Sequence, residues 1–395
     1  MQNMTSFRQK PGVHFSERNV FEAEWFDNVA SVLRKFYLYY YPADNTVELF
    51  DVKTKKTFLR RSKCEGLEAK DLYIGGVVKI FSRCMKITDF GDSATRSKLA
   101  STMQRTCATL KPNVIDKMGE ILKYITNHDI HIGNIKMVAL TNEEAADFYS
   151  HLRGHNELPF ILDYMISGPI VALELIGENC IKKWRELIGA ETSSVSVESG
   201  KTSLRARYGQ DSIHNSLHGS DSEEAAEREI NFFFSQPKSR RKGPKNTAVY
   251  KNCTCCVIKP HAVQARLIGD IINDIQQEGY KISAVQQFYI DPTNAEEFLE
   301  VYKGVLPDYN AMVAELQSGP CVAMEITHAD ESINVLTEFR KLCGPMDPEI
   351  ARQLRPHTLR AKYGKTKIQN AVHCSDIPED GLLEVEYFFK ILAEE

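Results

Sequence analysis

The stretch IHNSLHGSDS (213–222) places one histidine, His218, among residues that could support chemistry at its ring. Imidazole is a competent nucleophile near neutral pH because a good fraction of it is uncharged. Asn215 precedes the histidine, and the run SEEAAEREINFFF that follows predicts a helix, whose N-terminus favours phosphate. Arg205 and Lys111 would add positive charge for a phosphate group. This combination predicts phosphoryl transfer through a phosphohistidine.

A nucleophilic imidazole needs an acceptor that holds the proton on its second nitrogen. Glu229, on the predicted helix, is the candidate for that role. A metal hydrolase would need two or three further ligands at short spacing, and the sequence around His218 does not contain them. The cysteines 253, 255 and 256 form a cluster in the apolar run CTCCVIKP, which is best interpreted as a buried strand. Zinc or redox chemistry there is a distant alternative.

The histidine stretch occurs twice, which indicates two homologous domains. SLRARYGQDSIHNSLHGSDS (203–222) and TLRAKYGKTKIQNAVHCSDI (358–377) are identical at ten of twenty positions. Upstream, SGPIVALE matches SGPCVAME and ATLKPNVI matches CVIKPHAV, in the same order. The matching lysines, 111 and 259, lie 148 residues apart, and the matching histidines, 218 and 373, lie 155 apart. These spacings are typical of whole domains and far longer than those of a solenoid.

The repeat divides the chain into four segments. The two copies are expected at 104–235 and 252–395, with a basic linker at 236–251 and a different segment at 1–100. The linker run, SQPKSRRKGPKNTAVY, is best interpreted as solvated, and binding of phosphate or an acidic tail is less favoured. In each copy, apolar runs that stop at Lys-Pro are followed by residues at helical spacing. Each copy is therefore expected to be an α/β or α+β sandwich with helices on a small sheet.

The first hundred residues have another pattern. Runs such as VELFDV, KTFLRR and VVKIFSRCMKI predict successive strands with tight turns, and little of the segment has helical period. No cluster of His, Cys, Asp or Glu there resembles a catalytic site. We expect a small all-β module whose role is binding or anchoring.

The overall composition describes a globular chain. Of its 395 residues, 43% are apolar and 26% are charged, with a net charge of −4. This charge does not favour nucleic acid or an anionic membrane as a partner. No apolar window approaches the ~18 residues of a membrane span, and the N-terminus lacks the apolar core of a secretory signal. The expected location is therefore the cytoplasm, with the ten cysteines as free thiols.

Both copies resemble nucleoside diphosphate kinases. The family's run Asn-x-x-His-Gly-Ser-Asp is intact as NSLHGSD (215–221), and each copy also has the Lys-Pro, Ser-Gly-Pro and Arg-x-x-Tyr-Gly motifs. The resemblance implies an α+β fold class, with two ferredoxin-like α/β sandwich kinase domains. It also implies a ping-pong reaction in which ATP phosphorylates the histidine and the phosphate passes to another nucleoside diphosphate. Mg²⁺ would be carried with ATP, without a metal site of the protein's own.

The resemblance implies roles for particular residues of the first copy. His218 matches the phosphorylated nucleophile, Glu229 its orienting partner and Ser220 a hydroxyl beside it. The residues at ATP-binding positions are Lys111, Tyr149, Arg185, Arg205 and Asn215.

The first copy departs from the family in two places. Glu157 stands where an aromatic residue would lie under the base, and Phe160 is displaced. The segment after Gly189 also differs, although Thr192 matches a phosphate-binding threonine. Base binding is therefore expected to be weaker or altered while the chemistry is preserved.

The second copy keeps most of the matching residues. They are His373, Lys259, Tyr302, Arg340, Arg360, Asn370, Ser375 and Glu384. However, Cys374 replaces Gly219, and Met346 stands at the position of the threonine. A Cβ and a sulfur beside the nucleophile are expected to crowd the phosphate, and a thioether cannot donate a hydrogen bond to it. We therefore expect the second copy to be folded but impaired.

The first segment resembles the small PH-like β domain that recurs in proteins of axonemal doublet microtubules. The resemblance rests on LRKFYLYYYPADNTVELFDV and on the closing DSATR. It implies a microtubule inner protein whose partners are tubulin, other inner proteins and γ-tubulin complexes. The implied locations are the cytoplasm, the cytoskeleton and the cilium axoneme, with the centrosome or spindle as further sites.

These interpretations combine into one hypothesis, a ciliary microtubule protein that retains one competent kinase site. The alternative is a purely structural microtubule-binding scaffold without kinase activity. A 3′–5′ exonuclease ranks third, because the sequence has no metal-dependent nuclease motif. Members of the family assemble through pairs of these domains, so the two copies are expected to form a pseudo-dimer within one chain.

Overall fold

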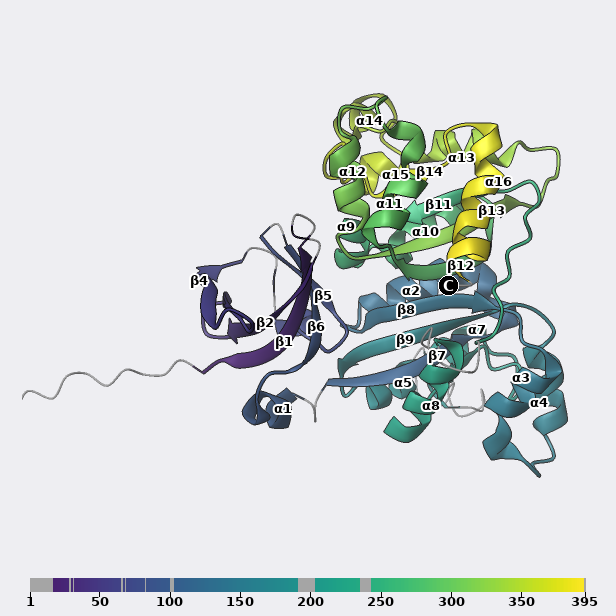
Figure 1. Cartoon of the computed structure of the whole chain (residues 1–395). Coiled ribbons are helices and arrows are strands. Elements are labelled where there is room, and N and C mark those ends of the chain that lie inside the picture. The colour runs from purple at the N-terminus through teal and green to yellow at the C-terminus, as the bar shows by residue number, and fades with distance from the viewer. Residues whose placement is uncertain are drawn as a thin grey trace, which may run out of the picture. The chain divides into compact units, whose positions relative to one another are not determined.

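The computed structural model describes residues 17–27, 30, 32–64, 67, 69–81, 83–99, 103–190, 203–234 and 243–393. Thr192, with the rest of 191–202, and the part 235–242 of the expected linker lie outside these residues. The chain divides into two compact units, Met1–Leu99 and Ala100–Glu395 (Figure 1).

The first unit is a six-stranded antiparallel sheet with strand order β4-β3-β2-β1-β6-β5. Its elements are β1 (Asn19–Asp27), β2 (Val32–Tyr41), β3 (Thr46–Asp51), β4 (Lys56–Lys63), η1 (Ala69–Asp71), β5 (Val77–Ile80), β6 (Arg83–Phe90) and α1 (Ser93–Leu99). Alternate residues of β2, namely Phe36, Leu38 and Tyr40, are buried, as the period of a strand requires. The prediction of a small all-β module is confirmed.

The second unit holds both copies in one antiparallel sheet with strand order β10-β7-β9-β8-β12-β13-β11-β14. The first copy has β7 (Met103–Leu110), η2 (Pro112–Lys117), α2 (Met118–Thr126), β8 (His131–Val138), α3 (Asn142–Phe148), η3 (Ser150–Leu152), α4 (Leu158–Met165), β9 (Ile170–Glu178), α5 (Cys180–Ile188), α7 (Leu204–Tyr208), β10 (Leu217–Gly219) and α8 (Glu223–Phe233). The second copy has β11 (Thr254–Ile258), α9 (Pro260–Gln264), α10 (Ile268–Gln277), β12 (Tyr280–Tyr289), α11 (Pro292–Phe298), η4 (Glu300–Tyr302), α12 (Tyr309–Leu316), β13 (Pro320–His328), α13 (Val335–Cys343), α14 (Pro348–Leu354), α15 (Leu359–Tyr363), β14 (Val372–Cys374), α16 (Pro378–Glu386) and η5 (Tyr387–Leu392).

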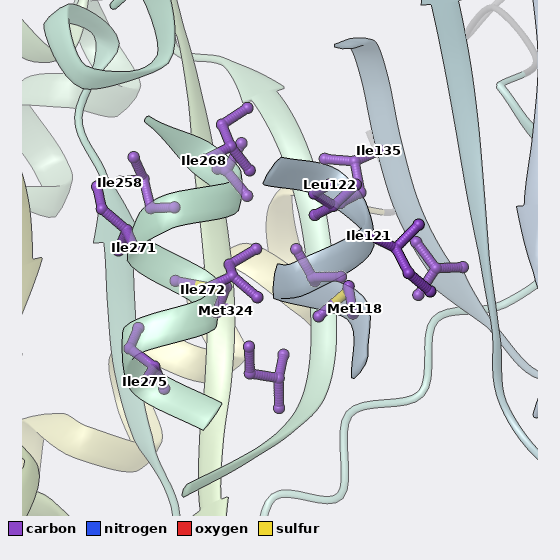
Figure 2. Close-up of a cluster of buried hydrophobic side chains, with 14 of the residues drawn as sticks. Met118, Ile121, Leu122, Ile135, Ile258, Ile268, Ile271, Ile272, Ile275 and Met324 are labelled. Carbon is purple, nitrogen blue, oxygen red and sulfur yellow. The ribbon is translucent and has the colours of Figure 1, made fainter. Parts of the chain in front are cut away.

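The two copies join at strands β8 and β12, where Lys136 pairs with Gln286. Where the two copies meet, helices α2 and α10 lie side by side against the sheet, and their apolar side chains form one buried cluster (Figure 2). The helices approach closely at two glycines. A Cβ at Gly119 would lie 2.2 Å from the backbone nitrogen of Asn273, and one at Gly269 would lie 2.3 Å from that of Lys123.

Polar contacts also cross the joint. The Gln276 side chain accepts from the Gly119 N–H at 2.8 Å and donates to the Ile115 carbonyl at 2.8 Å. Lys123 forms an ion pair with Asp270 at 2.7 Å. The copies therefore form an intrachain pair with a continuous sheet and a shared core.

Candidate active site

His218 lies in the short strand β10, which pairs with β7 opposite Thr109. The backbone turns sharply just before it, because Ser216 has a positive φ of 67°, an uncommon conformation for a residue other than glycine. The Lys111 N–H donates to the Ser216 carbonyl at 2.8 Å and holds this turn against the end of β7. Such locally strained backbone is often kept at functional sites.

The ring of His218 is held by a buried carboxylate. Its Nε2 lies 2.8 Å from Oε2 of Glu229, and the same oxygen accepts from the Ser220 hydroxyl at 2.8 Å. Burial acts to raise the pKa of Glu229, but the hydrogen bonds from His218 and Ser220 and the nearby charge of Arg228 hold the pKa below its usual value. An ionised carboxylate only accepts, so Nε2 carries the ring proton and Nδ1 keeps its lone pair.

Aromatic rings surround this histidine. Phe148 meets the ring edge to face, with centroids 5.4 Å apart, and Tyr149 lies 6.4 Å away. The Tyr149 hydroxyl is buried and has no hydrogen-bond partner among the residues described. On the other side of β10, Trp184 Nε1 donates to the His218 carbonyl at 3.1 Å. The ring is therefore fixed in place, and a buried hydroxyl without a partner among the described residues lies next to it.

The predicted cationic residues lie near β10, but with different surroundings. Lys111 donates to the Asn215 side chain at 2.7 Å. Arg205 is buried and donates to the carbonyls of Leu217 and Gly189, so its first effect is to hold the backbone around His218. Arg185 is exposed on α5 and forms no ion pair with a described residue. It lines a hollow together with Arg205, although His218 itself does not line that hollow.

The structure therefore brings most of the predicted residues of the first copy together around β10. The exceptions lie near the expected base site, where Glu157 is exposed and Phe160 is 62% exposed. Sequence reasoning missed Phe148 and Trp184, which stand directly before Tyr149 and Arg185. It also missed Tyr164, whose ring lies 5.6 Å from Lys111 Nζ. For Phe148 and Trp184, their positions next to predicted residues are the signal that could have found them, whereas the sequence around Tyr164 holds no such signal.

The second copy repeats the arrangement of the histidine and its acceptor. His373 Nε2 lies 2.8 Å from Oε2 of Glu384, which also accepts from the Ser375 hydroxyl at 2.7 Å. The preceding turn is repeated too, since Ala371 has a φ of 71°. Burial acts to lower the pKa of His373, but Glu384 outweighs burial and the pKa is raised. A raised pKa leaves less of the neutral, nucleophilic imidazole.

The space in front of His373 is closed by the second copy's own residues. The hollow there measures about 20 Å³, which is room for about one water molecule. The Asp376 carboxylate accepts from the Tyr302 hydroxyl at 2.5 Å and pairs with Arg340 at 3.3 Å. Arg340 also donates to the Asp376 carbonyl at 2.7 Å, and Met346 lines the same hollow. An internal anion therefore occupies the partners that a phosphate would use.

Two details differ from the expectations for the second copy. Tyr302 ends η4, which corresponds to η3 of the first copy, so its positional counterpart is Leu152, and Leu299 corresponds to Tyr149. In the second copy, the Cys374 thiol lies 3.7 Å from Arg360 Nη2 and packs in the core cluster. In the first copy, a Cβ at the equivalent Gly219 would lie 2.5 Å from Trp184. The shorter Phe339 replaces that tryptophan in the core. The cysteine is thus accommodated by repacking, and the closure comes from Asp376 and Met346.

The residues of the second copy that were predicted to bind phosphate by their positive charge are held in contacts within the protein. Burial lowers the pKa of Lys259 to about 7, and its Nζ donates to the Ile368 carbonyl at 3.0 Å. A lysine that is about half neutral at pH 7 attracts phosphate less than a fully charged one. Arg360 is buried and donates to the carbonyls of Val372 and Gly344. Asn370 donates to the Met346 carbonyl at 3.0 Å.

Two negative findings apply to the described part of the chain. No group of three or more His, Cys, Asp or Glu side chains there is placed to hold a metal ion. Within the same residues, every helix is too short or too polar to cross a bilayer.

The fold and the repeated histidine motif are those of one protein family, and the chain belongs to the nucleoside diphosphate kinase family. The family matches residues 104–238 and 252–392, and a domain described as the nucleoside diphosphate kinase 7 N-terminal PH domain matches residues 13–101. Over 380 residues the chain is 48% identical to nucleoside diphosphate kinase homolog 7 of Rattus norvegicus, covering 95% of this chain and 94% of that protein.

Other proteins are similar to a part of the chain. Thioredoxin domain-containing protein 6 of Xenopus laevis is 32% identical over 288 residues, which are 72% of this chain and 43% of that protein. A crystal structure of the Aquifex aeolicus nucleoside diphosphate kinase is 37% identical, covering 34% of this chain and 96% of that chain, with a TM-score of 0.33.

Proposed function

We propose that the first copy transfers a phosphoryl group from ATP to nucleoside diphosphates through a phosphohistidine at His218. The observation that supports this most directly is the pair of hydrogen bonds from His218 and Ser220 to one buried oxygen of Glu229. They leave Nδ1 as the nucleophilic nitrogen. The buried, unpartnered Tyr149 hydroxyl and the Lys111–Asn215 pair supply groups for phosphate oxygens.

The reaction has two halves. In the first, Nδ1 of His218 attacks the γ-phosphorus of ATP, the nitrogen–phosphorus bond forms, and the bond to the ADP oxygen breaks with its electron pair. In the second, a β-phosphate oxygen of another nucleoside diphosphate attacks the phosphorus, and the electron pair returns to Nδ1. Glu229 stabilises the positive charge that develops on the ring. Mg²⁺ enters with the nucleotide as part of the substrate.

A direct test uses the unmodified chain with γ-labelled ATP and magnesium. We expect label that survives alkali, is lost in acid, maps to the peptide containing His218, and is released as nucleoside triphosphate when a nucleoside diphosphate is added. Absence of label from a folded chain would leave the purely structural alternative. Degradation of single-stranded DNA from its 3′ end would instead support the exonuclease, although a metal-dependent nuclease would need an acidic metal site that the described residues do not form.

We further propose that the second copy is impaired because Asp376 and Met346 close its site. Replacing both, as Asp376→Ala with Met346→Thr, frees Tyr302 and Arg340 and opens the hollow beside His373. In a chain that also carries His218→Ala, we expect label on His373 to rise at least about tenfold, since the histidine and Glu384 are already in place. The rise is measured by mass spectrometry of the His373 peptide.

A matched change controls for general loosening of the second copy. Asp380→Ala removes a carboxylate at the start of α16 that is not bonded to Tyr302 or Arg340, and it should leave the label on His373 at background. An equal rise with Asp380→Ala, or no rise when Asp376 and Met346 are replaced, would contradict the proposed closure.

The cellular role that we propose is that of a ciliary microtubule inner protein in the cytoplasm, cytoskeleton and cilium axoneme. Its partners would be tubulin and other doublet microtubule inner proteins, with γ-tubulin complexes at the centrosome or spindle. The proposal is supported by the match of residues 13–101 to the N-terminal PH domain and by the all-β first unit. Imaging of a tagged chain tests it, and a signal absent from axonemes would count against it. Neither a membrane nor nucleic acid is among the proposed partners.

A further inference from the structure

Strand β4 forms one edge of the sheet in the first unit and carries an excess of positive charge. Its only strand neighbour among the described residues is β3, so its outer backbone edge is unpaired there (Figure 1). Between positions 52 and 64 the chain has no acidic residue. It has six basic ones, which are Lys53, Lys55, Lys56, Arg60, Arg61 and Lys63.

Most of these cations have no counter-ion within the described residues. Arg61 is the exception, because it pairs with Asp44 at 2.7 Å and lies over the Tyr41 ring. The remaining five are exposed, and no ion pair joins any of them to a described residue. Unpaired like charges along one strand repel one another, so their presence costs stability in the free protein.

The strand is nevertheless held firmly in the sheet. Phe58 and Leu59, in its middle, are half-buried and pack on the core of the unit. The Phe58 ring lies 5.1 Å from Phe36 and 6.3 Å from Trp25. An ordered edge with free N–H and C=O groups can accept a further strand from another chain.

The other edge of the same sheet provides a comparison. Strand β5 is only four residues long, Val77–Ile80, and Lys79 is its single charged residue. Short length and one lysine are common ways to protect an edge from unwanted pairing. Strand β4 is twice as long and has several more charges than such protection needs, which favours recognition of something acidic.

We propose that the edge of β4 binds an extended acidic segment of a partner protein, which adds to the sheet as a seventh strand. Backbone hydrogen bonds would hold the segment, and its Asp and Glu side chains would meet Lys56, Arg60 and Lys63. The proposal does not depend on the kinase site. Lipid headgroups or nucleic acid would also be attracted by positive charge, but neither would need a free strand edge.

The test uses the full chain and a fluorescein-labelled twelve-residue peptide of alternating glutamate and threonine, followed by fluorescence anisotropy. We expect saturable binding that weakens as salt rises. Reversing three charges, as Lys56→Glu, Arg60→Glu and Lys63→Glu, should weaken binding at least about tenfold. Reversing one charge at the opposite edge, as Lys79→Glu, should leave it unchanged. Circular dichroism checks that both variants keep their strands.

A second peptide separates strand addition from charge alone. Methylating every second backbone amide keeps all the carboxylates but removes the donors that pair with β4, so it should abolish binding. Equal binding of the methylated peptide would overturn the proposal. So would failure of the plain peptide to bind at low salt, or tighter binding to phosphatidylserine vesicles or single-stranded RNA than to the peptide.

Discussion

Replacing His218 with alanine is expected to remove at least about a thousandfold of the phosphotransfer rate, together with the acid-labile label. Besides the imidazole, the side chains that contact Glu229 are the Ser220 hydroxyl and the Arg228 guanidinium. Neither is a comparable nucleophile near neutral pH, so neither takes over from the imidazole. Some loss of stability is expected as well, because the histidine side chain is only 17% exposed and its removal takes a hydrogen bond from the buried Glu229. The rate is measured by nucleoside triphosphate formation, and folding by thermal unfolding.

The same change in the second copy is the matched control. His373→Ala removes the equivalent ring and its bond to Glu384, yet we expect it to leave the rate within about twofold. Asp376 occupies the Tyr302 hydroxyl and Arg340 there, and Met346 lines the small hollow beside His373, so little activity is expected to be lost. Comparable losses from both replacements would show that the second copy is active and would refute the assignment of activity to the first copy.

The largest effect on stability is expected from Gly119→Ala. The new methyl group would lie 2.2 Å from the backbone nitrogen of Asn273, and backbone atoms cannot move aside as a flexible side chain does. Alanine favours a helix more than glycine by about 1 kcal/mol, but overpacking against backbone costs about 3 kcal/mol or more. Net destabilisation of about 2 kcal/mol corresponds to a fall in melting temperature of roughly 4–8 °C.

Gly177→Ala is the control for this change. It adds the same methyl group in strand β9, where the nearest atom would be the Asp129 carbonyl oxygen at 3.4 Å, an ordinary contact. We expect its melting temperature to stay near that of the unchanged chain. A Gly119→Ala chain as stable as the Gly177→Ala chain would show that α2 and α10 do not cross as closely as described.

Much of the first site could be predicted because its central residues lie within one short stretch. Between His218 and Glu229 the chain forms a strand, a cap and two helical turns, and local spacing is enough to bring the side chains together. The repeat could be predicted for the same reason, since its motifs are contiguous. The all-β first unit could be predicted from apolar runs separated by tight turns, with little helical period, and the buried alternation of β2 agrees with it.

The closure of the second site could not be predicted, because it depends on residues far apart in sequence. Tyr302 reaches Asp376 across 74 positions. It stands at the end of η4, at the place of Leu152 in the first copy, rather than at the place of Tyr149. Similarly, whether the Cys374 side chain fits beside His373 depends on the size of the aromatic ring that packs against position 374. Only the packed core shows that a phenylalanine replaces Trp184 there and that the thiol turns toward Arg360.

The continuous sheet across β8 and β12 changes how the protein responds to dilution. When two separate chains form such a joint, mass action takes them apart as their concentration falls. Here the second half of the joint is always present at the high local concentration set by the connecting chain. A copy that has lost its own turnover can thus still keep its neighbour folded, even where the protein is scarce.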